Sequence, residues 1–179
     1  DTLYRTEAIL ESFDRANINY RIISANSDNW SEELATKDVS SFIPTFGIEN
    51  VDMIISNNDT MALGAIAYLQ TEGYNLGNGQ KSKGYIPVFG TDGIPRAIKA
   101  IREGTMTGTV YTDFSALAKV ALDIATSSKT SDEDITKVIW YQSREHTVNV
   151  PYAKFASFKD YTVRPYPVSE KKQNRKIKE

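Results

Sequence analysis

Apolar side chains recur at helical spacing in several segments of the chain, and we expect each of these segments to form an amphipathic helix. The segments are residues 2–16, 31–43, 60–72, 94–103 and 114–125. We expect Pro44 and Gly47 to end the second helix, Asp59 to cap the third, and Gly104 to stop the fourth.

Short β-prone runs alternate with these helices, at residues 20–24, 51–56, 86–90 and 107–112. The nearly continuous apolar run at 51–56 is typical of a strand that is covered on both faces. Strands that are separated by helices of this length need crossover connections, so we expect an α/β fold with a doubly wound parallel sheet. The β-rich end beyond Thr126 is expected to add one or two strands, and the tail from Val168 to be a frayed terminus.

The composition narrows the classes of function. The chain has 179 residues, of which 40% are hydrophobic and 25% are charged, as in an ordinary globular protein. A net charge of −2 disfavours a basic nucleic-acid-binding domain. The absence of Cys and the single His, His146, exclude disulfides, Cys-based zinc sites and multi-histidine metal sites. No run approaches the ~20 apolar residues that a membrane helix needs.

Polar side chains and one indole follow the predicted strands, where ligands of open parallel sheets bind. They are Trp30, Asn57, Asn58, Asp59, Thr91, Asp92, Thr112 and Asp113. Carboxylates and carboxamides match the hydroxyls of a sugar, and an aromatic face covers the apolar side of a sugar ring. An anion site would instead need Arg, Lys or a Gly-rich phosphate cradle. The set therefore favours a neutral polyol or sugar.

Each of these residues also has a purely structural interpretation. Asp59 and Asp113 are equally well explained as helix caps, and Asn57 is better explained by turn geometry. Trp30 alone would be a core or surface aromatic in most proteins, and Asp92 could equally form a loop hydrogen bond. Their shared edge, rather than any single residue, supports a binding site.

Three longer motifs carry a family resemblance. They are DMIISNNDTMALGAI at 52–66, IPVFGTDGIPRAIKAIREGTMTGTVYTD at 86–113 and VNVPYAKF at 148–155. Together they resemble the C-terminal part of the galactose/glucose-binding branch of the ribose-type periplasmic sugar-binding proteins of ABC transport. The resemblance implies that residues 1–160 form most of one lobe of a two-lobed protein, with residues about 113–130 crossing to an N-terminal lobe. We expect the chain to be a fragment that lacks that lobe, and residues 161–179 to be a poorly ordered tail.

The resemblance also assigns sugar-binding residues. Asp1 and Arg5 match the family's DxxxR motif, and Trp30 matches its stacking tryptophan. Asn58 and Asp92 match the motifs NND and FGxD. Thr112 stands where the best-known members have Asn, which leaves the sugar preference open. The implied sugar-binding set is Asp1, Arg5, Trp30, Asn58, Asp92 and Thr112.

The implied function is reversible binding of a hexose such as galactose or glucose for ABC transport or chemotaxis, without a reaction or a cofactor. The implied partners are the monosaccharide, a transporter permease or chemoreceptor, the missing lobe or a second chain, and no nucleic acid. The implied location is extracytoplasmic, in the periplasm or as a cell-surface lipoprotein. Asp52 matches one calcium ligand of the family, but the loop that carries the others lies upstream of Asp1, so no metal site is expected.

Two other classes of function compete with sugar transport, a transcriptional repressor and a glycosidase. The effector-binding domain of ribose-operon-type repressors shares the superfamily and its motifs, and it remains the alternative. A glycosidase needs two carboxylates at a set separation; Asp1 and Asp92 could lie near each other, but nothing else in the sequence supports hydrolysis. The glycines at 73, 77 and 79 do not form GxGxxG between a strand and a helix, which excludes a dinucleotide site of that type.

Overall fold

The computed structural model describes residues 2–77, 84–128, 131–139, 143–144, 147–148 and 153–155. These residues form two compact units. The first runs up to Tyr111 and includes Phe155, and the second runs from Thr112 to Lys154. Asp1, residues 78–83 and the predicted tail lie outside the described residues.

The helices of the first unit follow the predicted segments closely. They are α1 (Thr2–Arg15), α2 (Glu32–Phe46), α3 (Asp59–Thr71) and α4 (Pro95–Glu103), with a 3-10 turn, η1 (Ile48–Asn50). Gly104 ends α4 in the left-handed conformation, as predicted. The prediction that Asp59 caps α3 was wrong, because the side chain of Asn58 accepts the hydrogen bond from Met61 at the N-cap.

The prediction that Pro44 ends α2 was also wrong. The helix begins at the N-cap Ser31, whose hydroxyl accepts from the backbone of Leu34, and it continues through Pro44 to Phe46. Pro44 lies in the last turn, where its missing N–H removes only one helical hydrogen bond. Gly47 ends the helix, with φ of 82° and its N–H bonded to the Ile43 carbonyl.

Parallel strands form the sheet of the first unit. β1 (Ile54–Ile55) pairs with β2 (Val88–Asp92), and β2 pairs with β3 (Gly108–Tyr111). The strand order is β1-β2-β3-β6, where β6 is Ala153–Phe155. The α/β class and the parallel sheet were therefore predicted correctly. The prediction of a strand at residues 20–24 was wrong, because within the described residues no neighbouring strand pairs with this segment.

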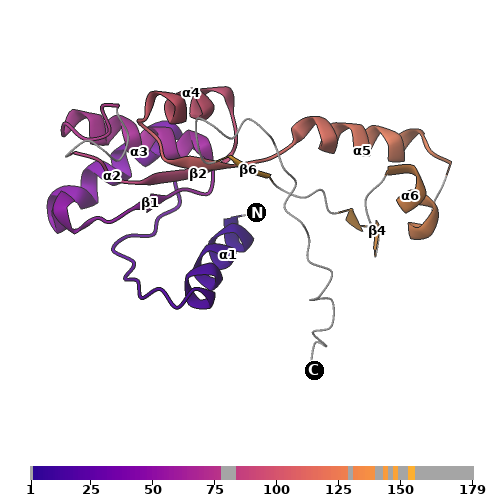
Figure 1. Cartoon of the computed structure of the whole chain (residues 1–179), viewed down its shortest axis with the longest axis horizontal. Coiled ribbons are helices and arrows are strands. Elements are labelled where there is room, and N and C mark those ends of the chain that lie inside the picture. The colour runs from indigo at the N-terminus through magenta and orange to yellow at the C-terminus, as the bar shows by residue number, and fades with distance from the viewer. Residues whose placement is uncertain are drawn as a thin grey trace. The chain divides into compact units, whose positions relative to one another are not determined.

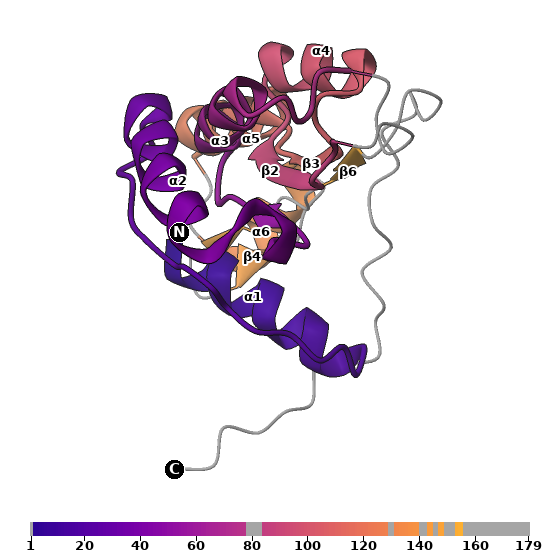
Figure 2. The same ribbon diagram turned by 90° about the vertical axis from the view of Figure 1, so that its left-hand side faces the viewer.

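The core of the first unit lies between the sheet and the helices α2, α3 and α4. Figures 1 and 2 show α2 beside α3 on one side of the sheet and α1 on the other. The buried core side chains are Val39, Ile43, Ala62, Ala65, Ile66, Leu69, Ile86, Val88, Ala97, Ala100, Ile101 and Met106.

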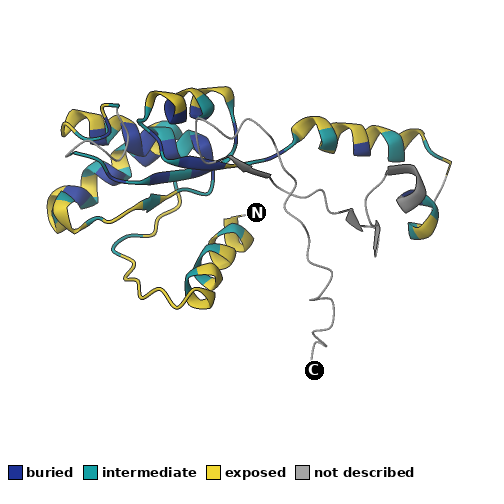
Figure 3. Ribbon diagram, in the orientation of Figure 1, coloured by how far each residue is buried: buried dark blue, intermediate teal, exposed yellow. Residues whose placement is uncertain are grey.

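The other face of the sheet is largely uncovered, so the prediction that the run at 51–56 is covered on both faces was wrong. Met53, Ile55 and Val110 are all exposed. Helix α1 has no buried residue, and Figure 3 shows only exposed and intermediate residues along it. The apolar face of α1 therefore lacks the packing that stabilises α2 and α3.

The second unit contains α5 (Phe114–Thr126), α6 (Asp132–Ile139) and the antiparallel strands β4 (Ser143–Arg144) and β5 (Thr147–Val148). The predicted helix at 114–125 is confirmed. Helix α6 was not predicted, although Ser131 caps it by accepting from the backbone of Asp134. No helix in the described part of the chain is long and apolar enough to cross a membrane.

Candidate functional site

Arg5 lies at the centre of a polar cluster at the carboxyl ends of β1 and β2. Its Nη2 lies 3.3 Å from Oδ1 of Asp92, and about four-fifths of both side chains is buried. Its Nη1 donates to the backbone carbonyl of Asn57. Helix α1 thereby connects to the ends of both strands through a single guanidinium group, whose planar array of donors suits this role.

Trp30 completes this cluster. The guanidinium carbon of Arg5 lies 5.7 Å from the centroid of the Trp30 ring, within the range of a cation–π contact. Trp30 is 42% exposed, so it is not a core aromatic. We call Arg5, Trp30 and Asp92 the Arg5 cluster.

Two residues of the Arg5 cluster have unusual backbone conformations. Trp30 has φ of 64° and Asp92 has φ of 118°, and residues other than glycine rarely adopt a positive φ. Such conformations cost roughly 1–3 kcal/mol each and concentrate at ligand sites. Gly93, with φ of 74°, follows Asp92, and a Cβ there would lie 2.4 Å from the Tyr111 ring. The chain therefore leaves β2 in a turn that a side chain at position 93 would obstruct.

Asn57 and Asn58 connect β1 to α3. Asn57 donates from Nδ2 to the hydroxyl of Thr6 at 3.0 Å, which holds α1 against the end of β1. Asn58 is 7% exposed, and its Oδ1 accepts the N–H of Met61 at 2.8 Å. The oxygen of Asn58 thus caps α3, and its Nδ2, which has no hydrogen bond to any described residue, is the group that could donate to a ligand.

Asp59 is a structural carboxylate. It is fully buried, its Oδ1 accepts from the hydroxyl of Thr109 at 2.6 Å, and its Oδ2 accepts from the backbone of Ile94 at 2.9 Å. Burial raises the pKa of Asp59, and the hydrogen bonds from Thr109, Ile94 and the backbone of Gly93 oppose this rise only in part. Gly90 allows the close approach, because a Cβ there would lie 2.3 Å from Oδ1 of Asp59. Asp59 therefore ties α3 to the loop before α4 and to β3.

The remaining predicted residues lie outside the Arg5 cluster as the structure describes it. Asp1 is outside the described residues. Thr112 belongs to the second unit, where it is 6% exposed and its hydroxyl has no hydrogen-bond partner within the described residues. Asp113 caps α5 by accepting from the backbone of Ala116 at 2.8 Å, which supports its structural interpretation.

The Arg5 cluster is suited to a neutral ligand with several hydroxyls. The charges of Arg5 and Asp92 compensate each other, so the pair offers donors and acceptors together without a net charge. The exposed face of Trp30 adds an apolar surface beside them. The Nε of Arg5 is buried without a hydrogen-bond partner among the described residues, and such a group calls for an acceptor that the described chain does not supply.

Sequence reasoning missed two contributors to this site. The backbone carbonyl of Asn57 holds Arg5, and the hydroxyl of Thr6 holds the side chain of Asn57. Thr6 directly follows Arg5 on α1. Its position at a helix end that lies beside a strand end was the only signal that could have predicted its contact with Asn57. Across the described residues, no group of three or more His, Cys, Asp or Glu side chains could hold a metal ion.

A family model described as a periplasmic binding protein domain matches residues 1–129. Among curated proteins, the D-galactose/methyl-galactoside binding periplasmic protein of Haemophilus influenzae is 25% identical over 152 residues. That alignment covers 85% of this chain and 43% of the relative, so the chain spans less than half the length of this relative.

Solved structures support the same fold. A periplasmic solute-binding protein of an ABC transporter from Actinobacillus succinogenes, with bound D-allose, has a TM-score of 0.60 and 23% identity. The comparison covers 84% of this chain and 46% of that one. The Caulobacter myo-inositol binding protein has a TM-score of 0.59 and 20% identity. That comparison covers 76% of this chain and 49% of the Caulobacter protein.

Proposed function

Because the chain belongs to the periplasmic binding protein domain family, we propose that it is part of an extracytoplasmic solute-binding protein. Its ligand is a monosaccharide or a related polyol, and its partner is an ABC transporter. Galactose and glucose are the first candidates, since the relative from Haemophilus influenzae is named for D-galactose and methyl-galactoside. The relatives named here are binding proteins, which fits a function without a reaction and favours transport over gene regulation.

The contact of Arg5 with Asp92, Asn57 and Trp30 carries this proposal. It brings three sequence-predicted residues together at one edge of the sheet, although Arg5 is 87 positions before Asp92 in the sequence. A sugar hydroxyl would accept from the guanidinium and donate to the carboxylate, while the sugar ring stacks on Trp30. Asn58 Nδ2 is proposed as a further donor. Asp1 and Thr112 remain proposed members of the site on the family resemblance alone.

Substitutions at the Arg5–Asp92 pair test the proposal. We expect Asp92→Asn and Arg5→Lys each to weaken galactose or glucose binding roughly 10- to 100-fold, because a hydrogen bond to a charged group contributes ~1.5–3 kcal/mol. Ligand-observed NMR titration of the 179-residue chain measures the affinity for galactose, glucose, xylose, allose and myo-inositol in turn.

A matched control uses an ion pair elsewhere on the first unit. Lys99 and Glu103 form an exposed i,i+4 pair of 3.7 Å on α4, so Glu103→Gln removes one carboxylate charge without touching the Arg5 cluster. Glu103→Gln should bind sugar like the unmodified chain. If Asp92→Asn keeps its urea-unfolding midpoint and binds as tightly as Glu103→Gln, the Arg5 cluster is not the sugar site.

A further inference from the structure

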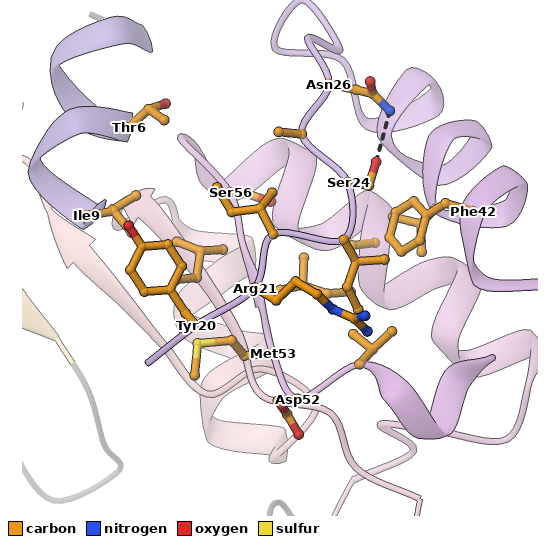
Figure 4. A pocket seen from close by; sticks show the side chains of 18 of the residues that line it. Thr6, Ile9, Tyr20, Arg21, Ser24, Asn26, Phe42, Asp52, Met53 and Ser56 are labelled. Carbon is orange, nitrogen blue, oxygen red and sulfur yellow. Dashed lines mark hydrogen bonds between the residues drawn. The ribbon is translucent and has the colours of Figure 1, made fainter. Parts of the chain in front are cut away.

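The turn that follows β2 carries Asp92, and a carboxylate from another element holds this turn. That carboxylate belongs to Asp59, the first residue of α3, which is fully buried. Figure 4 shows a pocket of about 710 Å³ that opens between residues 18–26 and 50–57, and neither Asp59 nor Asp92 is among the residues that line it. The contacts of Asp59 with the turn are therefore separate from this pocket.

Asp59 is anchored to the sheet. Its Oδ1 accepts from the hydroxyl of Thr109 at 2.6 Å, and a Cβ at Gly90 would lie 2.3 Å from the same oxygen. Gly90 and Thr109 are register partners in β2 and β3. The absence of a side chain at position 90 lets the carboxylate lie directly on the sheet, where the Thr109 hydroxyl fixes its orientation.

The same carboxylate reaches the turn after β2. Its Oδ2 accepts from the N–H of Ile94 at 2.9 Å, and the N–H of Gly93 also donates to the carboxylate. Successive backbone N–H groups form concavities that bind anions. In this turn, the anion is the side chain of Asp59 itself.

The turn has a conformation that needs such support. Asp92 has φ of 118° and Gly93 has φ of 74°. A residue with a Cβ keeps a positive φ only where the surrounding structure holds it. A Cβ at Gly93 would lie 2.4 Å from the ring of Tyr111, which is the register partner of Asp92. The Tyr111 ring therefore confines the turn, and the Asp59 carboxylate holds its amides.

These contacts determine how Asp92 is presented. The N–H of Gly93 belongs to the peptide unit that begins with the carbonyl of Asp92, so a bond to this N–H restrains the ψ angle of Asp92. The backbone conformation in turn limits the rotamers of the Asp92 side chain. Asp59 has no exposed surface, so it does not contact a ligand itself. Any effect of Asp59 on a ligand is transmitted through Asp92.

We propose that Asp59 is a positioning residue of the sugar site. Its carboxylate holds the amides of Gly93 and Ile94 and thereby directs the Asp92 carboxylate toward the ligand, which preorganises the site for a polyol. This inference rests on the proposed function, because it concerns the same site. A purely structural role of Asp59 would change the stability of the first unit and leave the sugar affinity of the folded chain unchanged.

A pair of variants separates positioning from stability. Thr109→Val removes the hydroxyl that binds Asp59 and keeps the carboxylate at the turn, so it should bind galactose like the unmodified chain. Asp59→Ala combined with Thr109→Val also removes the acceptor of the turn's amides. The double variant leaves no unpaired hydroxyl at position 109, which limits its loss of stability. In ligand-observed NMR titrations, it should bind galactose roughly tenfold more weakly than Thr109→Val, because the Asp92 turn is no longer preorganised.

Asp59→Asn provides the conservative rescue. Its amide oxygen still accepts from the turn, and its amide nitrogen can donate to the Thr109 hydroxyl. Asp59→Asn should therefore bind galactose within about twofold of the unmodified chain.

Amide exchange in the unmodified 179-residue chain tests the coupling without any substitution. Coupling between two events is reciprocal, so saturating galactose should slow the exchange of the Gly93 and Ile94 amides roughly fivefold or more. The matched control is the amide of Ile86, which precedes β2 and donates to Oδ1 of the buried Asn75 at 2.9 Å. Its exchange should change less than that of the two turn amides.

Three results would overturn the inference while the proposed function stands, with Asp92→Asn still weakening sugar binding. The first is equal affinity of the double variant and Thr109→Val. The second is a loss of affinity in Asp59→Asn as large as in the double variant. The third is an equal change in amide exchange at Gly93, Ile94 and Ile86.

Failure of the proposed function has a different signature. If Asp92→Asn binds galactose as tightly as the control Glu103→Gln, Asp92 is not part of a sugar site. The positioning role of Asp59 then fails together with the proposed function.

Discussion

Asp59 is a buried carboxylate that connects α3 to the loop before α4 and to β3. Its folded-state pKa is raised above the ordinary value of 3.8, mainly by burial. The folded state therefore binds more protons than the unfolded state just above pH 3.8, and the contribution of Asp59 to stability falls as pH rises through that window. At neutral pH, hydrogen bonds from the Thr109 hydroxyl and from the backbone of Ile94 and Gly93 hold the buried charge.

Replacing Asp59 with Asn separates the charge from the hydrogen bonds. The amide oxygen can accept from Ile94, and the amide nitrogen can donate to the Thr109 hydroxyl, so we expect little loss of stability at pH 7. The free energy of unfolding of Asp59→Asn relative to the unmodified chain should increase from pH 4 to pH 7, as measured by urea unfolding. Asp59→Ala, which leaves both donors without an acceptor, should cost ~1–3 kcal/mol for each. A pH-independent difference for Asp59→Asn would contradict the raised pKa.

Sequence motifs identified the side chains of the candidate site better than their structural roles. Arg5, Trp30 and Asp92 were predicted and lie together. The capping role of Asn58 was not predicted, because Asn and Asp are both good N-caps and the pattern NND does not say which of them begins the helix. The contact of Arg5 with the Asn57 carbonyl could not be predicted, since a backbone carbonyl has no sequence signature.

Helices α2 and α3 pack closely because of one small residue. A Cβ at Gly64 would lie 2.2 Å from the Glu32 carbonyl oxygen and 3.1 Å from Cβ of Ala35. The hydroxyl of Thr36 also donates to the Gly64 carbonyl at 2.9 Å. Helix propensity and packing therefore make opposite predictions for Gly64→Ala.

We expect packing to prevail in Gly64→Ala. Propensity alone would stabilise α3 by ~1 kcal/mol. Overpacking against the backbone of α2 costs ~1–3 kcal/mol, so the net result should be a free energy of unfolding that is lower by up to about 2 kcal/mol. Urea denaturation measures this change. Ala67→Gly, at an exposed position of the same helix, provides the propensity value alone. A stabilised Gly64→Ala chain would show that α2 and α3 are not in close contact.

The helices of the first unit were predictable from sequence, whereas one strand and one helix were not. Apolar spacing and caps are local signals, and they placed α1 to α4 within a few residues. A β-prone segment becomes a strand only where another strand pairs with it. The structure describes no strand beside residues 20–24, so this run does not form one. Helix α6 has few apolar positions, and its cap at Ser131 with three acidic residues in its first turn was the only clue.

At the scale of the whole molecule, the chain spans less than half the length of the named relative and structures. The assignment of residues 1–160 to one lobe, with residues about 113–130 crossing to another, stays a prediction. Phe114, Leu117 and Leu122 on α5 are exposed. This prediction has a second lobe share the sugar contacts, so we expect the 179-residue chain by itself to bind sugar weakly.

The size of this loss can be estimated. Buried ligand sites cover ~70–90% of their ligand, and a single lobe covers only one side. Losing about four hydrogen bonds of ~0.5–1.5 kcal/mol each removes roughly 2–6 kcal/mol, which moves a micromolar site to the millimolar range or weaker.

NMR titration of the 179-residue chain with galactose, observed at the Arg5 guanidinium and the Trp30 indole N–H, tests the central claim most directly. We predict a dissociation constant on the order of millimolar, with the largest shifts at Arg5 Nε–H and Trp30, because the buried Nε has no partner among the described residues and would gain one from the ligand. A Trp140→Phe chain leaves Trp30 as the only tryptophan and removes any ambiguity of assignment. Saturable shifts elsewhere in the chain, with Arg5 and Trp30 unchanged, would contradict the account.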